Sequence, residues 1–277
     1  MKNKKSEIAM IVILTVISVL FIAPIIIVFM NSFKSKLYIN STPFALPNAD
    51  SFVKMANYGE GLIKTGFIQA FFITLFITVA SVVLIVLLTS MTAWYLVRVK
   101  SHFTKVLYYL FAFAMIVPFQ MVMFTLSQTA DKLKLNTPFN IWVIYLGFGA
   151  GLAVFMFCGF VKSIPIEIEE AAMIDGCTPI QTFFQVVFPI MKPTAITVAI
   201  LQAMWIWNDY LLPYLVLDIK KYKTIPIVIQ YLKGGYGAVD WGTMMAMLVL
   251  AIVPIVVFYV ACQKYIIEGV VAGAVKG

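Results

Sequence analysis

The chain has 277 residues, of which 62% are hydrophobic and only 12% are charged, and its formal net charge is +8. Soluble proteins are typically about 45–50% apolar and about one quarter charged, so this composition argues against a soluble enzyme and against a disordered scaffold. The basic residues are scattered through short connectors between apolar runs, which disfavours a nucleic-acid partner. The composition indicates a protein that crosses a membrane several times.

The first apolar run, about residues 8–30, follows a start that contains Lys2, Lys4 and Lys5. A basic start before an apolar run is also typical of a secretory signal peptide. This run is longer than the roughly 7–15 apolar residues of such a peptide, and no small-x-small cleavage site follows it. We therefore expect a retained helix that spans the membrane.

Further apolar runs follow, and each is long enough to cross a hydrocarbon core of roughly 30 Å as a helix. The predicted six spans are about residues 8–30, 67–97, 104–126, 138–161, 194–216 and 241–263. An even number places both termini on one side. Basic residues divide equally between the sides, but the first lysines and the pair Arg98 and Lys100 crowd the span ends, which favours cytoplasmic termini.

The connectors differ in character. Residues 31–66 are polar and irregular, and residues 217–240 contain lysines and glycines, so both are expected outside the cell. Residues 162–193 form a long cytoplasmic loop and residues 264–277 a cytoplasmic tail. No internal repeat is visible, which disfavours a secondary transporter built from inverted repeats. We expect a single transmembrane domain that covers residues 1–277.

Residues that could carry catalysis or hold a metal are few. Cys158, Cys177 and Cys262 are far apart in the sequence, and His102 is the only histidine. An enzyme acting within the membrane would need paired acid–base or nucleophilic groups there. Asp209 is the only carboxylate inside an apolar run. We therefore predict neither a metal site nor a catalytic site in this chain.

The loop at residues 162–193 contains start and stop signals for a short helix. Ser163 can cap this helix, and Pro165 suits its first turn. Glutamates follow near the helix start, where the helix dipole favours negative charge. Gly176 can adopt a positive φ and should end the helix.

A second short helix is predicted directly afterwards. Thr178 followed by Gln181 has the spacing of a capping box. Pro189 should interrupt this helix, and Pro193 should open the fifth span. The predicted result is a helix–turn–helix that lies on the cytoplasmic surface.

The first of these helices should present the small side chains of Ala171 and Ala172 together with carboxylates. Small residues let another surface approach closely, and carboxylates can pair with its Arg or Lys residues. The alternative is an amphipathic helix resting on lipid headgroups, but its glutamates would be repelled by an anionic leaflet. We therefore favour a docking surface for another protein.

Several stretches form recognisable motifs. They are Glu170-Ala171-Ala172, Asp175-Gly176, Pro189, Trp207-Asn208-Asp209 with Pro213, Pro118 with Gln120, and the tail from Gly269 to Gly277. The first three are similar to the EAA loop of ABC importer permeases. The tail resembles that of the carbohydrate-importer subunits related to the second maltose permease. The resemblance covers nearly the whole chain.

The resemblance implies the ABC type I importer permease fold, which is all-α and integral to the membrane, with six transmembrane helices and a cytoplasmic EAA coupling helix. It implies a homologous second permease subunit, two ATPase subunits and an extracellular solute-binding protein as partners, and a place in the bacterial cytoplasmic membrane. The chain would be a transport subunit and not an enzyme. It has no Gly-x-x-x-x-Gly-Lys-Ser/Thr phosphate loop, so we expect ATP and Mg²⁺ to bind only to the ATPase subunits.

The resemblance also implies roles for particular residues. The implied ATPase-coupling residues are Glu169, Glu170, Ala171, Ala172, Asp175, Gly176 and Pro189. The implied contacts of the tail with the ATPase subunits are Gly273, Lys276 and Gly277.

Polar residues in the fifth span suggest a substrate pathway. Gln202, Trp205 and Asp209 follow one helical stripe, with Asn208 beside it. Amides, carboxylates and aromatic faces are the groups that bind sugars. The same residues could instead cap or join helices, or the aromatic rings could form an interfacial belt, so both interpretations stay open.

The expected function is that of a permease subunit in an ATP-driven, binding-protein-dependent importer of a sugar, with an oligosaccharide favoured. The alternative is another solute, such as glycerol phosphate or an osmolyte. Asp209 facing the pathway would repel a phosphorylated solute. Pro118 and Pro254 would permit helix motion but are equally compatible with static kinks.

Overall fold

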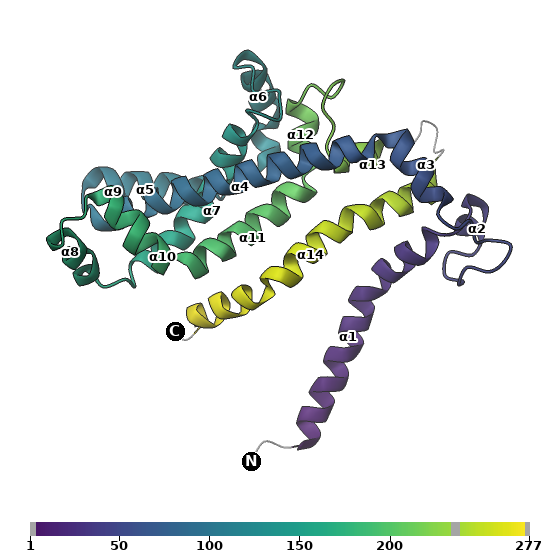
Figure 1. Ribbon diagram of the computed structural model, residues 1–277, viewed down its shortest axis with the longest axis horizontal. Helices are drawn as coiled ribbons and strands as arrows, with labels where there is room; N and C mark the ends of the chain where they lie inside the picture. The colour runs from purple at the N-terminus through teal and green to yellow at the C-terminus, as the bar shows by residue number, and fades with distance from the viewer. Residues whose placement is uncertain (1–3, 234–238, 275–277) are drawn as a thin grey trace. The chain divides into compact units, whose positions relative to one another are not determined.

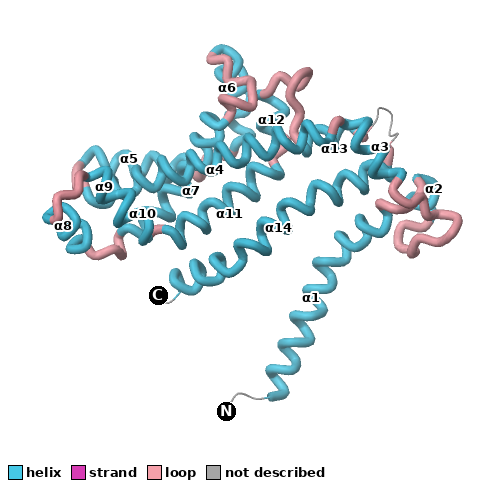
Figure 2. Tube along the Cα trace, in the orientation of Figure 1, coloured by secondary structure: helices cyan, strands magenta, loops and turns pink. Residues whose placement is uncertain are grey.

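The structure, a computed structural model, describes residues 4–233 and 239–274. This part of the chain is built from helices and contains no strand beyond isolated β-bridges (Figure 1, Figure 2). The helices of the first part are α1 (Lys4–Asn31), α2 (Lys36–Ser41), α3 (Ala56–Thr65), α4 (Phe67–Arg98), α5 (His102–Ala114), α6 (Phe119–Lys132) and α7 (Trp142–Val161). Those that follow are α8 (Ile166–Ile174), α9 (Pro179–Thr182), the π-helix η1 (Phe183–Val187), α10 (Phe188–Ile190), α11 (Lys192–Asn208), α12 (Leu211–Val216), α13 (Ile225–Tyr231) and α14 (Trp241–Ala274).

The chain divides into two compact units. The first unit comprises Met1–Gln69 and Ile227–Pro254, and the second comprises Ala70–Pro226 and Ile255–Gly277. Helices α4 and α14 each contain residues of both units.

In the first unit, buried polar side chains hold the segment that follows α1. Nδ2 of Asn57 donates to the carbonyl oxygens of Ser32 at 2.8 Å and Lys34 at 2.9 Å. Nζ of Lys34 donates to the carbonyl oxygens of Thr42 at 2.6 Å and Ala45 at 2.9 Å. Lys34 is fully buried, and this burial lowers the pKa of its ammonium group. The loop after α2 thus closes over a buried cation.

A surface network of charges joins α3 to the start of α14 within the same unit. Nζ of Lys64 lies 3.1 Å from Oδ2 of Asp240 and also pairs with Glu60, one turn earlier on α3. The hydrogen bonds to Glu60 and Asp240 raise the pKa of Lys64. Partial burial acts to raise the pKa of Asp240, but the hydrogen bond from Lys64 opposes it and the pKa is lowered overall.

The core of the second unit forms around α7, which packs against α5 and α11. The side chains of this helix that are fully buried include Tyr145, Ala153, Val154, Phe157 and Val161. Gly151 allows the close approach to α5, because a Cβ atom there would lie 2.9 Å from the carbonyl oxygen of Phe111 and 2.7 Å from Cγ of Met115. A Cβ atom at Gly147 or Gly159 would have nothing within 4 Å. Small residues at such contacts are typical of helix packing in membranes.

Several described helices are long and apolar enough to span a membrane. Four pass this test alone, namely Glu7–Asn31, Phe67–Arg98, Trp142–Val161 and Trp241–Lys264. The number rises to six if each of two bent pairs is one span: α5 with α6, bent by 104°, and Pro179–Ile190 with α11, bent by 77°. The predicted all-α fold with several apolar helices is confirmed.

One break falls inside a span that the sequence predicts as continuous. Within residues 104–126, α5 ends at Ala114 and α6 begins at Phe119. Pro118 precedes α6 with an extended backbone (φ −65°, ψ 137°). Because proline has no N–H and disfavours a helical residue before it, a regular helix cannot pass through this position without distortion.

A second break falls within the predicted span at residues 194–216. Helix α11 ends at Asn208, Asp209 is extended with ψ 120°, and α12 begins at Leu211. Pro213 lies four residues after Asp209, where its ring would clash with the Asp209 carbonyl group in a continuous helix. Oδ1 of Asp209 accepts hydrogen bonds from the N–H groups of Leu211 at 3.0 Å and Leu212 at 3.3 Å, and so satisfies the first turn of α12.

Candidate functional site

Helix α8 connects α7 to α9 within the second unit (Figure 1). Pro165 forms its N-cap with an extended backbone, and Glu167 lies in its first turn. The expectation that Ser163 caps this helix is wrong, because its hydroxyl donates to the carbonyl oxygen of Phe160 at 2.7 Å. Gly176 follows the helix with φ +89°, which confirms the predicted stop.

The capping box of α9 is confirmed. The hydroxyl of Thr178 accepts from the N–H of Gln181, and the N–H of Thr178 donates to Oε1 of Gln181 at 2.8 Å. Two local hydrogen bonds thereby fix where the second helix starts.

The predicted interruption at Pro189 takes the form of a change in winding, because the α-helix gives way to the π-helix η1 just before this residue. The helix continues through η1 and α10 to Ile190, where the bend to α11 begins. In η1 the N–H of Phe188 donates to the carbonyl oxygen of Phe183, five residues earlier. Pro193 lies in the first turn of α11, as predicted.

Helix α8 has one exposed face and one buried face. Its exposed polar and small residues include Glu170, Ala171, Asp175 and Gly176. The neighbouring side chain of Ile174 is 86% exposed. Glu169 and Ala172 are 1% and 9% exposed and face the interior of the unit. Only part of the predicted coupling surface is therefore available to another protein.

The buried carboxylate of Glu169 is held by two side chains of α4. Its Oε1 accepts from Nε of Arg98 at 2.9 Å and from Nη2 of Arg98 at 2.6 Å. Its Oε2 accepts from the indole N–H of Trp94 at 2.8 Å. Nη2 of Arg98 also donates to the carbonyl oxygen of Ile164 at 2.9 Å. A buried charge needs such partners, since leaving it unpaired is strongly unfavourable.

Sequence reasoning misses this role of Trp94 and Arg98. It uses Arg98 only as a topology signal and does not consider Trp94. The sequence does contain one signal of a shared role: the two residues are four positions apart at the end of an apolar helix, so they lie on the same face of it. Their common partner Glu169 is 71 residues further along the chain than Arg98, which no local pattern reveals.

The residues predicted for a substrate pathway have different surroundings. Gln202 is 3% exposed, and its Nε2 donates to the carbonyl oxygen of Gly149 at 3.3 Å. Trp205 is 40% exposed, and its ring lies edge-on to Tyr145 with centroids 5.5 Å apart. Asn208 is exposed, and its Nδ2 donates to a carbonyl oxygen one turn earlier. Trp205 and Asn208 therefore offer accessible surface, whereas Gln202 does not.

Asp209 is half-buried, and both of its carboxylate oxygens are engaged. Oδ2 accepts from the hydroxyl of Tyr145 at 3.1 Å, while Oδ1 accepts from the first N–H groups of α12. These contacts correspond to the helix-joining role that the sequence left open as an alternative.

The predicted tail contacts lie at the end of the described chain. Gly273 belongs to the last turn of α14, which ends at Ala274. Lys276 and Gly277 lie outside the described residues. A role for these three residues stays a prediction.

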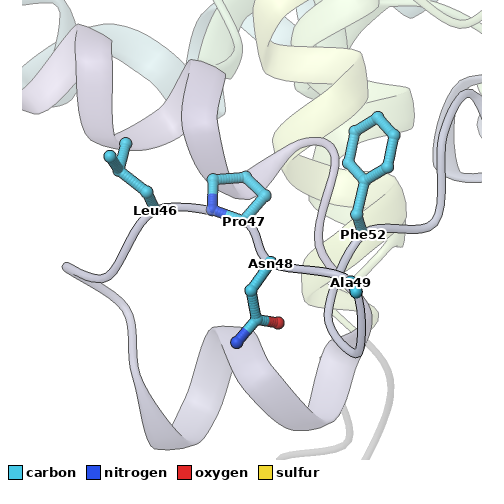
Figure 3. Close-up of a pocket in the computed structure, with 5 residues that line it drawn as sticks. All are labelled: Leu46, Pro47, Asn48, Ala49 and Phe52. Atoms are coloured by element: carbon cyan, nitrogen blue, oxygen red, sulfur yellow. The ribbon is translucent and has the colours of Figure 1, made fainter.

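A pocket of about 480 Å³ lies on the segment between α2 and α3 in the first unit (Figure 3). Leu46, Pro47 and Phe52 project to one side of this segment, and Asn48 projects to the other (Figure 3). Ala49 completes the lining. The lining is mainly apolar, with Asn48 as its polar side chain.

A family model described as "Binding-protein-dependent transport system inner membrane component" matches residues 85–271. The chain belongs to this family. The match contains the α8–α10 loop and α11, and it confirms that the chain resembles permeases. This family member is accordingly a multi-pass transport component of the cytoplasmic membrane.

Two relatives match this family member over nearly their whole length. It is 40% identical to the "Probable starch degradation products transport system permease protein AmyC" of Thermoanaerobacterium thermosulfurigenes, over 94% of both chains. It is 32% identical to the "Multiple sugar-binding transport system permease protein MsmG" of Streptococcus mutans, over 96% of this chain and 95% of the relative.

The fold is also that of a solved transporter. The crystal structure of a bacterial ABC transporter involved in the import of the acidic polysaccharide alginate contains a chain that matches with a TM-score of 0.78 and 24% identity. The match covers 96% of this chain and 99% of the other. The predicted ABC importer permease fold is thereby confirmed.

Proposed function

We propose that this family member is the permease subunit of an ATP-driven importer that takes up oligosaccharides from a solute-binding protein. The similarity along nearly the whole chain to relatives named for starch degradation products and for multiple sugars carries the proposal. The partners are a homologous second permease subunit, two ATPase subunits that bind ATP and Mg²⁺, and an extracellular solute-binding protein. The chain supplies half of the translocation pathway.

The exposed face of α8 is the proposed contact with an ATPase subunit. Glu170 and Asp175 offer carboxylates to basic side chains, and Ala171 and Gly176 allow close approach. Ile174 is 86% exposed beside them. Burying a side chain of this kind contributes roughly 1.5–3 kcal/mol, which supports docking here. The inward-facing Glu169 and Ala172 hold α8 in place instead of touching the ATPase.

The proposed sugar contacts are Trp205 and Asn208. The indole of Trp205 offers an apolar face to a sugar ring, and the amide of Asn208 can exchange hydrogen bonds with hydroxyl groups. Gln202 and Asp209 support these residues through their contacts with Gly149 and Tyr145. In the tail, Gly273, Lys276 and Gly277 are proposed to reach between the ATPase subunits.

Substrate uptake by the complete complex in proteoliposomes tests the function. With the solute-binding protein outside and ATP inside, we expect uptake of a malto-oligosaccharide and none of glycerol 3-phosphate. Uptake of glycerol 3-phosphate combined with failure of every neutral oligosaccharide would contradict the proposal.

The docking role is tested by Gly176→Pro. Proline cannot adopt the φ of +89° at this position. We expect the chain to insert in the membrane but uptake to be lost. Gly59→Ala is the control, since a Cβ atom there would have nothing within 4 Å. Normal uptake by Gly176→Pro would remove α8 from the coupling path.

A further inference from the structure

The buried contact between Arg98 and Glu169 joins α4 to α8 across 71 residues of sequence. The Glu169 side chain is 1% exposed and that of Arg98 is 19% exposed. We infer that this contact makes α8 and the end of α4 move as one body, so that Arg98, Glu169 and Trp94 are positioning residues for coupling. The inference rests on the proposed function, in which α8 receives the ATPase.

Both oxygens of the Glu169 carboxylate accept hydrogen bonds from side chains of α4. Oε1 is bound by two N–H groups of Arg98, and Oε2 is bound by the indole N–H of Trp94. Trp94 and Arg98 are four residues apart, or about 6 Å along the axis of α4. A shift of α8 along α4 in either direction therefore breaks at least one charge-assisted hydrogen bond.

The same two α4 side chains also contact the segments before and after α8. Nη2 of Arg98 donates to the carbonyl oxygen of Ile164, in the turn that precedes α8. The ring of Trp94 packs on the fully buried ring of Phe183, the first residue of η1, with centroids 5.6 Å apart. Helix α8 is thus fixed to α4 before, within and after its own length.

The two adjacent glutamates of α8 have different surroundings. Glu170 is exposed and available to a partner, whereas Glu169 is directed inward to α4. A force applied to the exposed face is therefore transferred through the Glu169 contact to Arg98. Arg98 ends a continuous helix of 32 residues, so the movement reaches the length of a membrane span.

Stability alone is a weak reason for such a contact. The desolvation of a buried ion pair largely offsets its attraction, and well-packed apolar residues often replace one without loss. An apolar replacement would not fix the orientation of α8 relative to α4. The forked guanidinium and the indole N–H fix the orientation of α8 as well as its position.

The test uses the complete complex, reconstituted with its ATPase subunits and solute-binding protein. Glu169→Gln keeps the shape but removes the charge, Arg98→Lys removes the fork, and Trp94→Phe removes the indole donor. Glu167→Gln is the matched control, because Glu167 is exposed in the first turn of the same helix. Two quantities are measured: sugar moved per ATP hydrolysed, and amide hydrogen exchange across residues 164–176.

We expect Glu169→Gln and Arg98→Lys to hydrolyse ATP at a rate close to that of wild type while moving about tenfold less sugar per ATP. Trp94→Phe should show a smaller loss in the same direction. Exchange should become faster in α8 while that of α7 is unchanged, which separates loss of position from global unfolding. Glu167→Gln should match wild type in both measurements.

Two results would overturn the inference. One is a normal ratio of sugar to ATP in Glu169→Gln, whether or not exchange changes. The other is loss of assembly in all three variants of the contact, which would assign it to folding alone. Failure of the proposed function is recognised separately, because the wild-type complex would then show no sugar uptake that depends on the binding protein.

Discussion

The contact of α7 with α5 at Gly151 can be tested with a single methyl group. In Gly151→Ala the new Cβ atom lies 2.7 Å from Cγ of Met115 and 2.9 Å from the carbonyl oxygen of Phe111. The Met115 side chain can turn away, but the Phe111 oxygen belongs to the backbone, so the helices must separate. Overpacking of this kind typically costs about 1–3 kcal/mol.

Gly147→Ala is a matched control on the same helix. Its Cβ atom would have nothing within 4 Å, so only helix propensity changes, by up to about 1 kcal/mol in favour of alanine. The propensity gain is common to both variants and cancels in their difference. Gly151→Ala should therefore be less stable than Gly147→Ala by about 1–3 kcal/mol.

Thermal unfolding of wild type and both variants in one detergent provides the measurement. The midpoint of Gly151→Ala should lie below that of Gly147→Ala, and Gly147→Ala should equal or exceed wild type. Equal midpoints for the two variants would mean that α5 and α7 do not approach closely at Gly151.

Three further predictions concern charge and backbone geometry. In the folded state the pKa of Asp240 is lowered and that of Lys64 is raised. The ion pair therefore stabilises the folded state fully between about pH 4 and pH 10. This stabilisation is lost as the pH falls through the pKa of Asp240 or rises through the pKa of Lys64. The unfolding midpoint of Asp240→Asn should thus lie below that of wild type at neutral pH, and the two midpoints should converge as the pH falls below the ordinary aspartate pKa of about 4; coincident curves at every pH would contradict the network. Lys34→Met removes two charge-assisted hydrogen bonds to the carbonyl oxygens of Thr42 and Ala45, at about 1.5–3 kcal/mol each, so limited proteolysis after α2 should accelerate, whereas the exposed control Lys36→Met should behave as wild type. Gly176→Ala forces alanine to a φ of +89° and should lower the stability measured by thermal unfolding by about 1–2 kcal/mol; an unchanged midpoint would show that the turn adapts.

The parts of the loop that sequence reasoning predicts correctly are those decided by near neighbours. The stop at Gly176 depends on one residue that accepts positive φ, and the start at Thr178 depends on Gln181, three positions away. Pro193 likewise acts only on its own helix turn. These signals need no knowledge of the tertiary structure, and so a single sequence contains them.

The errors arise where local and non-local preferences compete. Pro118 and Pro213 disfavour a continuous helix, but the long apolar runs around them favour continuous spans, and the predicted spans follow the runs. The direction of Glu169 depends on Arg98 and Trp94 in a distant helix, whereas the sequence motif places Glu169 among the residues that contact an ATPase subunit. A buried carboxylate is the exception to the general preference of charge for the surface.

The wide turn of η1 sets the rotational phase between the start of the second loop helix and α11. Phe183–Val187 is wound so that its hydrogen bond joins residues five positions apart. If one of them were deleted while the winding stayed wide, Pro179–Thr182 would rotate by about a quarter turn relative to the residues that follow. Everything attached upstream, including α8, would turn with it and present a different side to its surroundings. The number of residues in this segment should therefore tolerate less change than their identity.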